Sequence, residues 1–501
     1  MPKYRIRTVR TASGAKAIQI VLYTENVRKI IKHIGSAKND DELELLRIQA
    51  EQYITDNDPQ LLLFDQDQKR IVDFENIEAT KVTHEFARNI LLMLADKCNL
   101  SSLNPLYRDL AIMRILEPCS KLRSIELLEQ YFGISYTQYL YELLPKLLNQ
   151  RSIIAEAAIE TAKSFGDTFT LLLYDVTTLY FETHKPDDDL QARGFSKDDK
   201  SKQPQIIIGL LVTAQGFPLI HEVFKGNTFE GYTMLSVIKS FQKQYGTTKP
   251  IIVADAAMLS KENQSTLDSE GYQYIVGTRL ANAKHSFISS LCNQIEKKDG
   301  AIIRMTYSTD YDVICSYSLA RYKKAKRELD KQIERAEKLI ARKEPGKRAK
   351  FVKKSRSSDK PYIFDEVLKH KTEQLLGIKG YCTNIPEKEL SNSDVITYYH
   401  NLWRVEQAFR MSKSDLKSRP IFHHSHDAIK AHVLICFMAL MIGKFIEIKT
   451  GLSVRRVRDM LWQVHDINLR DPFSGKERSV RTAIMPELAR ALNALEIKIP
   501  H

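Results

Sequence analysis

The sequence predicts a mixed α/β fold, and two observations support that prediction. Apolar residues at helical spacing fill positions 75–165, whereas positions 166–280 hold short β-branched runs separated by turns and helical segments. The composition is that of a soluble globular chain, with 43% hydrophobic and 27% charged residues. At 501 residues the chain is too long for one compact core, so several domains are expected.

The first 165 residues are expected to contain two regions. Residues 1–70 predict an N-terminal α+β region of short strands followed by an amphipathic helix. Residues 71–165 predict a helical, candidate DNA-binding region, in which residues 120–148 form two helices around a turn at 132–135. That outline fits a helix-turn-helix DNA reader, and it also fits any helical hairpin.

The order of elements over residues 166–280 indicates a particular sheet. We expect strand, strand, strand, helix, strand, helix, strand, with a hairpin around Gly216 joining the second and third strands. Three antiparallel strands followed by β-α-β units describe the first part of an RNase H-like core. In that topology the first and fourth strands are parallel neighbours, because a crossover helix returns the chain alongside.

Two acids are expected to lie on these neighbouring strands. Asp175 is in the middle of the first strand, where a charge is costly unless it is paired or bound to a metal. Asp255 ends the fourth strand. Adjacent strands are about 4.8 Å apart, so the two carboxylates can face one small volume. Like charges that close need cations, and hard divalent ions such as Mg²⁺ prefer oxygen ligands.

The rest of the chain completes the core and adds two basic regions. Residues 281–375 predict an insertion subdomain, in which Arg321–Lys354 begins as an amphipathic helix and breaks at 345–346. That helix is either solvated or a phosphate-contacting arm. Residues 376–450 form the second part of the core, beginning with a strand that returns to the sheet. Residues 451–501 form a basic tail that contacts DNA or a second subunit, or else is a basic surface helix and loop.

Charge and cysteine usage narrow the class of protein. The net charge is +13 and the pI about 9.2, which suits a polyanion such as nucleic acid, although a basic soluble protein has the same composition. Six scattered cysteines without a C-x-x-C pair exclude a zinc ribbon and a disulfide framework, and indicate a reducing cytosol. The N-terminus is not typical of a signal peptide. The longest apolar run, Val433–Phe445, is too short to span a membrane and predicts a buried helix.

A third acid belongs to an unusual stripe. Tyr399, Glu406 and Lys413 are spaced by seven and seven, which is nearly two turns of helix per step, so one helix would align all three. A phenol, a carboxylate and an ammonium on one face of an otherwise apolar helix suggest a site. An exposed face with an intrahelical ion pair is the alternative.

These motifs together resemble the DDE transposases of bacterial insertion sequences, in the IS-four superfamily. The helix motif of that family is Tyr, two residues, Arg, three residues, Glu, six residues, Lys, and Tyr399, Glu406 and Lys413 match it. The Arg position is Leu402, a departure, and Arg410 is a better substitute than Arg404. The stretch "LWRVEQAFRMSKSDLKSRPIFHH" resembles the 1634-like subgroup, and "YDVTTLYFE", "VADAAMLSKEN" and "TNI" also match, over roughly residues 100–450.

The resemblance implies roles for six residues. Asp175, Asp255 and Glu406 would be the catalytic acids and would hold two Mg²⁺ or Mn²⁺ ions. The DNA-binding residues would be Tyr399, Lys413 and Arg410. Two metals about 3.5–4 Å apart can activate the nucleophile and stabilise the leaving oxygen of a phosphodiester.

The function expected from this resemblance is cut-and-paste DNA transposition. The enzyme would cleave at terminal inverted repeats and transfer the freed strand to target DNA, as a homodimer holding two ends, in the bacterial cytoplasm at the nucleoid and without a membrane partner. The alternatives are a domesticated, non-catalytic DNA-binding protein and a stand-alone RNase H-like nuclease.

Two smaller motifs can also be explained by an ordinary structural role. Gly226 and Asn227, beside the hairpin, match the family but also form an ordinary turn. Four histidines follow the Glu406 segment and favour loop, packing or DNA-contact roles over zinc binding, because no cysteine accompanies them; they are His423, His424, His426 and His432.

Overall fold

The computed structural model divides the chain into two compact units. The residues that it describes are 3–12, 14–24, 27–57, 77–136, 140–182, 188–194, 203–246, 249–258, 260–341, 349–354, 362–470 and 477–499. The first unit holds the described residues up to Ile77, and the second begins at Glu78.

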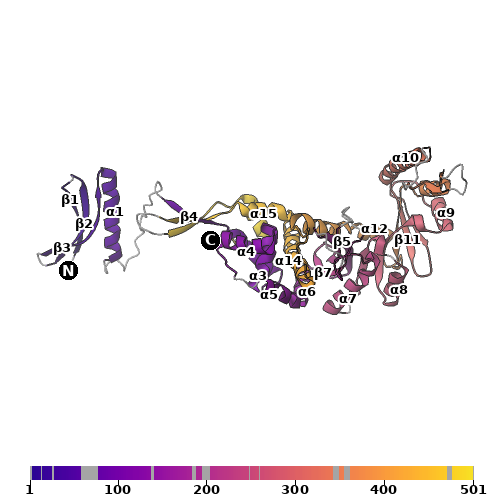
Figure 1. Cartoon of the computed structure of the whole chain (residues 1–501), viewed down its shortest axis with the longest axis horizontal. Coiled ribbons are helices and arrows are strands. Elements are labelled where there is room, and N and C mark those ends of the chain that lie inside the picture. Colours follow the sequence, from indigo (N-terminus) through magenta and orange to yellow (C-terminus); the bar gives the residue numbers. More distant parts are fainter. Residues whose placement is uncertain are drawn as a thin grey trace. The chain divides into compact units, whose positions relative to one another are not determined.

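The first unit is a three-stranded antiparallel sheet with one helix (Figure 1). Alternation places Ile18 and Ile20 on one face of the central strand, where both are fully buried against the helix residues Leu43 and Ala50. The predicted order of strands followed by a helix is therefore confirmed. The elements are β1 Lys3–Arg10, β2 Lys16–Thr24, β3 Val27–Ala37 and α1 Asp40–Asn57.

The second unit contains an eight-stranded mixed sheet in the order β10-β11-β14-β9-β8-β5-β6-β7. Strand β5 pairs antiparallel with β6 and parallel with β8, as predicted for the first and fourth strands. The β6–β7 hairpin turns at Gly216, whose φ of +86° favours glycine. The strands are β5 Leu171–Tyr180, β6 Gln205–Thr213, β7 Pro218–Lys225, β8 Ile251–Ala254, β9 Gln273–Thr278, β10 Ile302–Thr306, β11 Asp312–Tyr317 and β14 Ile378–Thr383.

Two predicted crossover helices are present, α7 (Met234–Tyr245) and α8 (Lys261–Ser269), and they connect β7 to β8 and β8 to β9. Beyond β9 the chain forms a further helix, α9 (His285–Gln294). Its buried Ile288 and Leu291 lie three apart, which is a helical spacing.

The segment predicted as an insertion, 281–375, is partly continuous with the sheet. Strands β10 and β11 extend the sheet beyond β14. The remainder packs around its own small core, where Leu329 and Ala336 of the basic helix meet Phe351. The predicted apolar stripe is therefore confirmed, whereas the predicted break at 345–346 lies outside the described residues. The elements of this part are α10 Leu319–Ala341, β12 Val352–Lys354, β13 Tyr362–Phe364 and α11 Glu366–Gln374.

A helical region covers one side of the sheet, and its central element is α14 (His426–Thr450) (Figure 1). This helix is long and apolar enough to cross a membrane, but 89% of its most apolar window is buried inside the protein, as the prediction of a buried helix requires. It packs on α3, α5 and β7. The other helices here are α2 Glu85–Lys97, α3 Pro105–Leu116, α4 Lys121–Phe132, α5 Leu140–Leu147 and α6 Arg151–Ser164.

The C-terminal segment is not the surface helix and loop considered as one alternative, because it is built into the helical region. The Asp466 carboxylate accepts hydrogen bonds from Phe86 N at 2.8 Å and from Arg481 Nε at 2.7 Å, which joins α2 to two C-terminal strands. Buried apolar residues on α15 explain why this basic helix docks. The elements of this segment are α15 Val454–Trp462, β15 Asp466–Arg470, β16 Glu477–Arg481 and α16 Pro486–Ala494, and β15 also pairs with β4, Glu78–Thr83.

Candidate active site

The structure brings Asp175 and Asp255 to the same level of adjacent strands. The parallel register pairs Tyr174 of β5 with Ala254 of β8, so the next residue on each strand is an aspartate. At a strand spacing of about 4.8 Å, this register brings the backbones of the two aspartates close to each other. Asp175 is half-buried between fully buried neighbours, whereas Asp255 is exposed where β8 ends.

Tyr399 is bonded to one of these acids. Its hydroxyl donates to Asp255 Oδ1 at 3.1 Å, and only 7% of the residue is exposed. Burial, followed by the charge of Asp255 and this hydrogen bond, raises the pKa of Tyr399, so the phenol stays protonated and remains a donor. Tyr399 therefore positions Asp255 in this structure, and its predicted contact with DNA stays a prediction.

Tyr399 fits over the sheet because Gly277 has no side chain. Gly277 follows Val276, the β9 partner of Ala254, and so lies level with Asp255. A Cβ at Gly277 would lie 2.5 Å from the Tyr399 hydroxyl. The ring of Tyr381, on the next strand, packs edge-on against Tyr399 with centroids 4.9 Å apart. The surface of the sheet and the helix that carries Tyr399 thus fit closely together around this phenol.

The predicted single helix through Tyr399, Glu406 and Lys413 is wrong. The segment is broken at 401–402, where Arg404 N and Val405 N bind carbonyls only three residues back, at 2.9 and 3.1 Å. Such tight turns, and the wider π turn that follows, change the rotation per residue, so the seven-residue spacing by itself no longer defines one shared face. Besides burial, the charge of Glu406 still acts on Tyr399 and raises its pKa. The pieces are α12 Asn392–His400, α13 Trp403–Arg410 and a π-helix Met411–Asp415.

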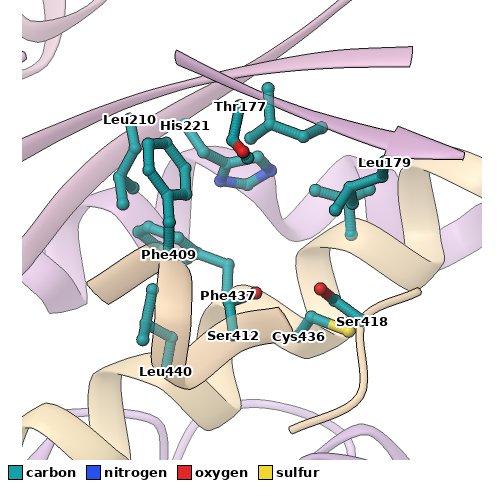
Figure 2. A pocket seen from close by; sticks show the side chains of 12 residues that line it. Thr177, Leu179, Leu210, His221, Phe409, Ser412, Ser418, Cys436, Phe437 and Leu440 are labelled. Atoms are coloured by element: carbon teal, nitrogen blue, oxygen red, sulfur yellow. The ribbon is translucent and has the colours of Figure 1, made fainter. Parts of the chain in front are cut away.

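Helix α13 nevertheless covers the face of β5 that carries Asp175. A small pocket of about 30 Å³ is lined by Thr177 and Leu179 of β5 and by Phe409 of α13 (Figure 2). Side chains alternate along a strand, so Asp175 shares the face of Thr177 and Leu179. Glu406 lies one helical turn before Phe409 and is exposed.

Lys379 is a member of the site that sequence reasoning missed. Its ammonium lies 4.4 Å from the centre of the Tyr399 ring and 5.4 Å from that of Tyr381. Burial, then Arg321, lowers the pKa of Lys379, while the charges of Asp255 and Glu406 act in the opposite direction. The negative charges of both acids thus act on the Lys379 ammonium. The available signal was a lysine inside an otherwise apolar strand, "IKGYCT".

The other motif residues have distinct surroundings. Lys413 is half-buried in the π-helix, and Arg410 is exposed at the end of α13. Leu402 is 8% exposed and belongs to the main core, which explains how this position accommodates leucine where the motif has arginine. Arg404 donates to Gln215 O at 3.2 Å and so faces the β6–β7 hairpin.

The donor set fits a hard divalent cation in chemistry but is not gathered into a cluster. Carboxylates are ligands that Mg²⁺ prefers, and Asp175 and Asp255 supply two of them from neighbouring strands. Within the described ranges, no three His, Cys, Asp or Glu residues are grouped closely enough to hold a metal ion. Glu406 is therefore placed on the covering helix without completing a three-acid group.

A pocket of about 260 Å³ lies beside Asp255. Its lining includes Ala256, which follows Asp255, and Gly277, over which Tyr399 packs. Arg279 and the exposed Phe229 also line it. A cation and an aromatic face at the edge of a carboxylate pair suit a nucleic-acid strand, whose phosphates and bases these groups attract.

Comparisons with known proteins identify the class. A family model described as the transposase DDE domain matches residues 168–442, more than half of the chain, and the chain belongs to this family. No curated protein matches. A solved structure described as a cryo-EM structure of the piggyBac transposase synaptic complex with hairpin DNA is similar at 10% identity, over 82% of this chain and 77% of that chain, with a TM-score of 0.35. That similarity is too low to carry an argument.

Proposed function

We propose that the protein catalyses cut-and-paste transposition of an insertion sequence, cleaving DNA at terminal inverted repeats and transferring the freed strand to target DNA. The observation that carries this proposal is the placement of Asp175 and Asp255 level on parallel neighbouring strands, inside the region matched by the transposase family model. Glu406, on the helix that covers the same face, is the proposed third acid.

We further propose that strands β5 to β9 form an RNase H-like core. The order β7-β6-β5-β8-β9, with three antiparallel strands and two parallel additions, supports this assignment. We also propose that the protein belongs to the IS-four superfamily of these transposases, because Tyr399, Glu406 and Lys413 match the helix motif of that superfamily. Two element ends must be held together in transposition, so we propose that the protein acts as a homodimer.

Each residue of the site has a proposed task. Asp175, Asp255 and Glu406 would hold Mg²⁺ or Mn²⁺, which supplies an activated nucleophile and stabilises negative charge on the phosphate. Tyr399 keeps one Asp255 oxygen oriented through its hydrogen bond. Lys379 offsets the repulsion between Asp255 and Glu406. Lys413 and Arg410 would contact backbone phosphates, which position DNA without reading its sequence.

The direct test is metal-dependent cleavage. Purified protein is mixed with duplex DNA carrying the element's terminal repeats, in Mg²⁺, in Mn²⁺ and in chelator, and nicked and joined products are separated on denaturing gels. We expect both products with either metal and neither in chelator. Repeat binding without nicking in any metal would instead indicate a non-catalytic binder, and nicking without end specificity or joining would indicate a simple nuclease.

Gly277→Ala is expected to lower the cleavage rate about tenfold while the protein stays folded. The added methyl displaces the Tyr399 phenol and breaks its bond to Asp255, and hydrogen bonds to charged groups contribute about 1.5–3 kcal/mol. Tyr399→Phe removes the same bond without a clash and is the matched variant. Normal cleavage by Gly277→Ala alongside a defect in Tyr399→Phe would show that the phenol is not displaced.

A further inference from the structure

A second cluster of polar groups lies in the helical region, apart from the carboxylates. Arg114 of α3, Lys121 of α4 and His432 of α14 are 7%, 4% and 4% exposed. They line a pocket of about 270 Å³ together with the loop that follows the π-helix, 417–423. Leu122 and Phe422 of the same lining are exposed, so the pocket reaches the surface.

The hydrogen bonds of His432 show which of its two ring nitrogens carries the proton. Its Nε2 lies 2.9 Å from Ser418 O, a carbonyl that can only accept, so Nε2 carries the proton. Its Nδ1 is then the acceptor for both Lys121 Nζ and Arg114 Nη2, the latter at 3.5 Å. One lone pair is thus shared between two cationic side chains.

The described lining of this pocket has a surplus of donors and no acid. An ammonium has three N–H donors and a guanidinium has five, yet among the described residues Lys121 bonds only to His432, and Arg114 adds only Lys417 O at 3.5 Å. None of the described lining residues is acidic, while six are Arg, Lys or His. Burying cations without a counter-charge is costly, so the cluster is arranged for an anion from outside.

Two further features favour a phosphate. Lys121 and Leu122 occupy the first turn of the twelve-residue helix α4, where backbone N–H groups have no partner within the helix and attract anions. Burial and then Arg114 lower the pKa of Lys121 well below its usual value. A bound anion would favour the charged lysine and reverse that effect.

We propose that this pocket binds a phosphate group of the DNA backbone, at a site separate from the carboxylates. The inference rests on the proposed function for its choice of DNA over a free phosphate. The pocket loop is bonded to the catalytic strand, since Ile421 N donates to Tyr180 O at 3.1 Å at the end of β5. The same loop continues the chain from Glu406, so a phosphate held here would anchor DNA against the elements that carry the acids.

Lys121→Met tests the proposal, because it removes the charge and keeps the length of a buried side chain. Binding of a fluorescent terminal-repeat duplex and of an unrelated duplex is measured by anisotropy at several salt concentrations. We expect affinity for both duplexes to fall about fivefold, and the slope of log affinity against log salt to decrease by about 0.9, the value of one phosphate contact. The matched control Lys146→Met, an exposed lysine on α5, should change neither by as much.

Three outcomes would overturn the proposal that this pocket binds a DNA phosphate. Wild-type affinity and slope in Lys121→Met overturn the proposal. If inorganic phosphate raises the thermal midpoint of wild type but not of Lys121→Met while duplex binding is unchanged, the pocket takes free phosphate and the DNA assignment is wrong. Should Lys121→Met fail to fold, Lys417→Met, at the exposed rim, is measured in the same way, and a wild-type slope again overturns the proposal.

Cleavage measured in parallel separates this proposal from the proposed function. If wild type fails to cut repeat DNA but Lys121→Met still weakens duplex binding, the transposition proposal fails and the phosphate pocket stands. If wild type cuts and Lys121→Met binds normally, the pocket alone is refuted.

Discussion

Asp175→Asn is expected to lower the rate of repeat-DNA cleavage by a factor on the order of 10³ or more, with DNA binding nearly unchanged. Asparagine keeps the shape of the half-buried side chain on β5 but removes the negative charge that would hold a divalent cation. Several kcal/mol of transition-state stabilisation depend on such an ion, and each 1.36 kcal/mol corresponds to tenfold in rate. The same loss is expected for Asp255→Asn and Glu406→Gln.

The matched control for these variants is Glu262→Gln. Glu262 is an exposed acid on α8, seven residues after Asp255, and its neutralisation should leave cleavage unchanged. Thermal unfolding in Mn²⁺ gives a second measurement, because an ion bound to the folded state raises the midpoint of wild type and not of the three site variants. Cleavage by Asp175→Asn at the wild-type rate would refute the assignment of the acids.

Gly226→Ala is expected to lower the free energy of unfolding by about 3 kcal/mol or more. A Cβ at this position would lie 1.9 Å from Gln205 O and 2.3 Å from Ala192 O, both of them backbone atoms that cannot rotate away. Gly226 is also held by its own backbone, whose N–H donates to Leu190 O at 3.1 Å and whose carbonyl accepts from Gln205 Nε2 at 2.9 Å. The chain can accept a methyl here only by separating these segments.

Urea unfolding followed by tryptophan fluorescence measures this loss. Asn227→Ala is the matched control, since Asn227 is the exposed next residue and surface substitutions usually change stability by less than about 0.5 kcal/mol. Equal stability of the two variants would mean that the segment 188–194 moves freely away from Gly226. The expected result assigns Gly226 a packing role, which favours the structural alternative for this motif.

Hydrophobic patterns in the sequence were sufficient to predict the parts of the fold that depend on local periodicity. Strand β5 around Asp175, the hairpin at Gly216 and the end of β8 before Asp255 all follow from alternation and turn residues, which act over a few positions. The parallel pairing of β5 with β8 also followed from the order of elements, because connection rules leave few topologies open.

The features that were mispredicted or missed depend on contacts between distant segments. The break at 401–402 replaced one continuous helix, because the α12–α13 segment has to pack against the sheet at both ends. Lys379 lies at the site because its strand, β14, pairs with β9, the strand that carries Gly277. The C-terminal tail joined the helical region through Asp466, nearly four hundred residues from Phe86 in sequence.

By itself, the sequence predicted which residues would carry the chemistry: Asp175 stands out because an acid in an apolar strand needs a reason to be there, and the family motif adds Asp255 and Glu406. Only the tertiary structure decided what surrounds them, namely the Tyr399 hydroxyl on Asp255 and the glycine that admits it. It also gathered the basic residues around Lys121 into a separate pocket. The physical reason is that local patterns report which face of an element is buried, whereas hydrogen bonds and close approaches depend on which elements meet.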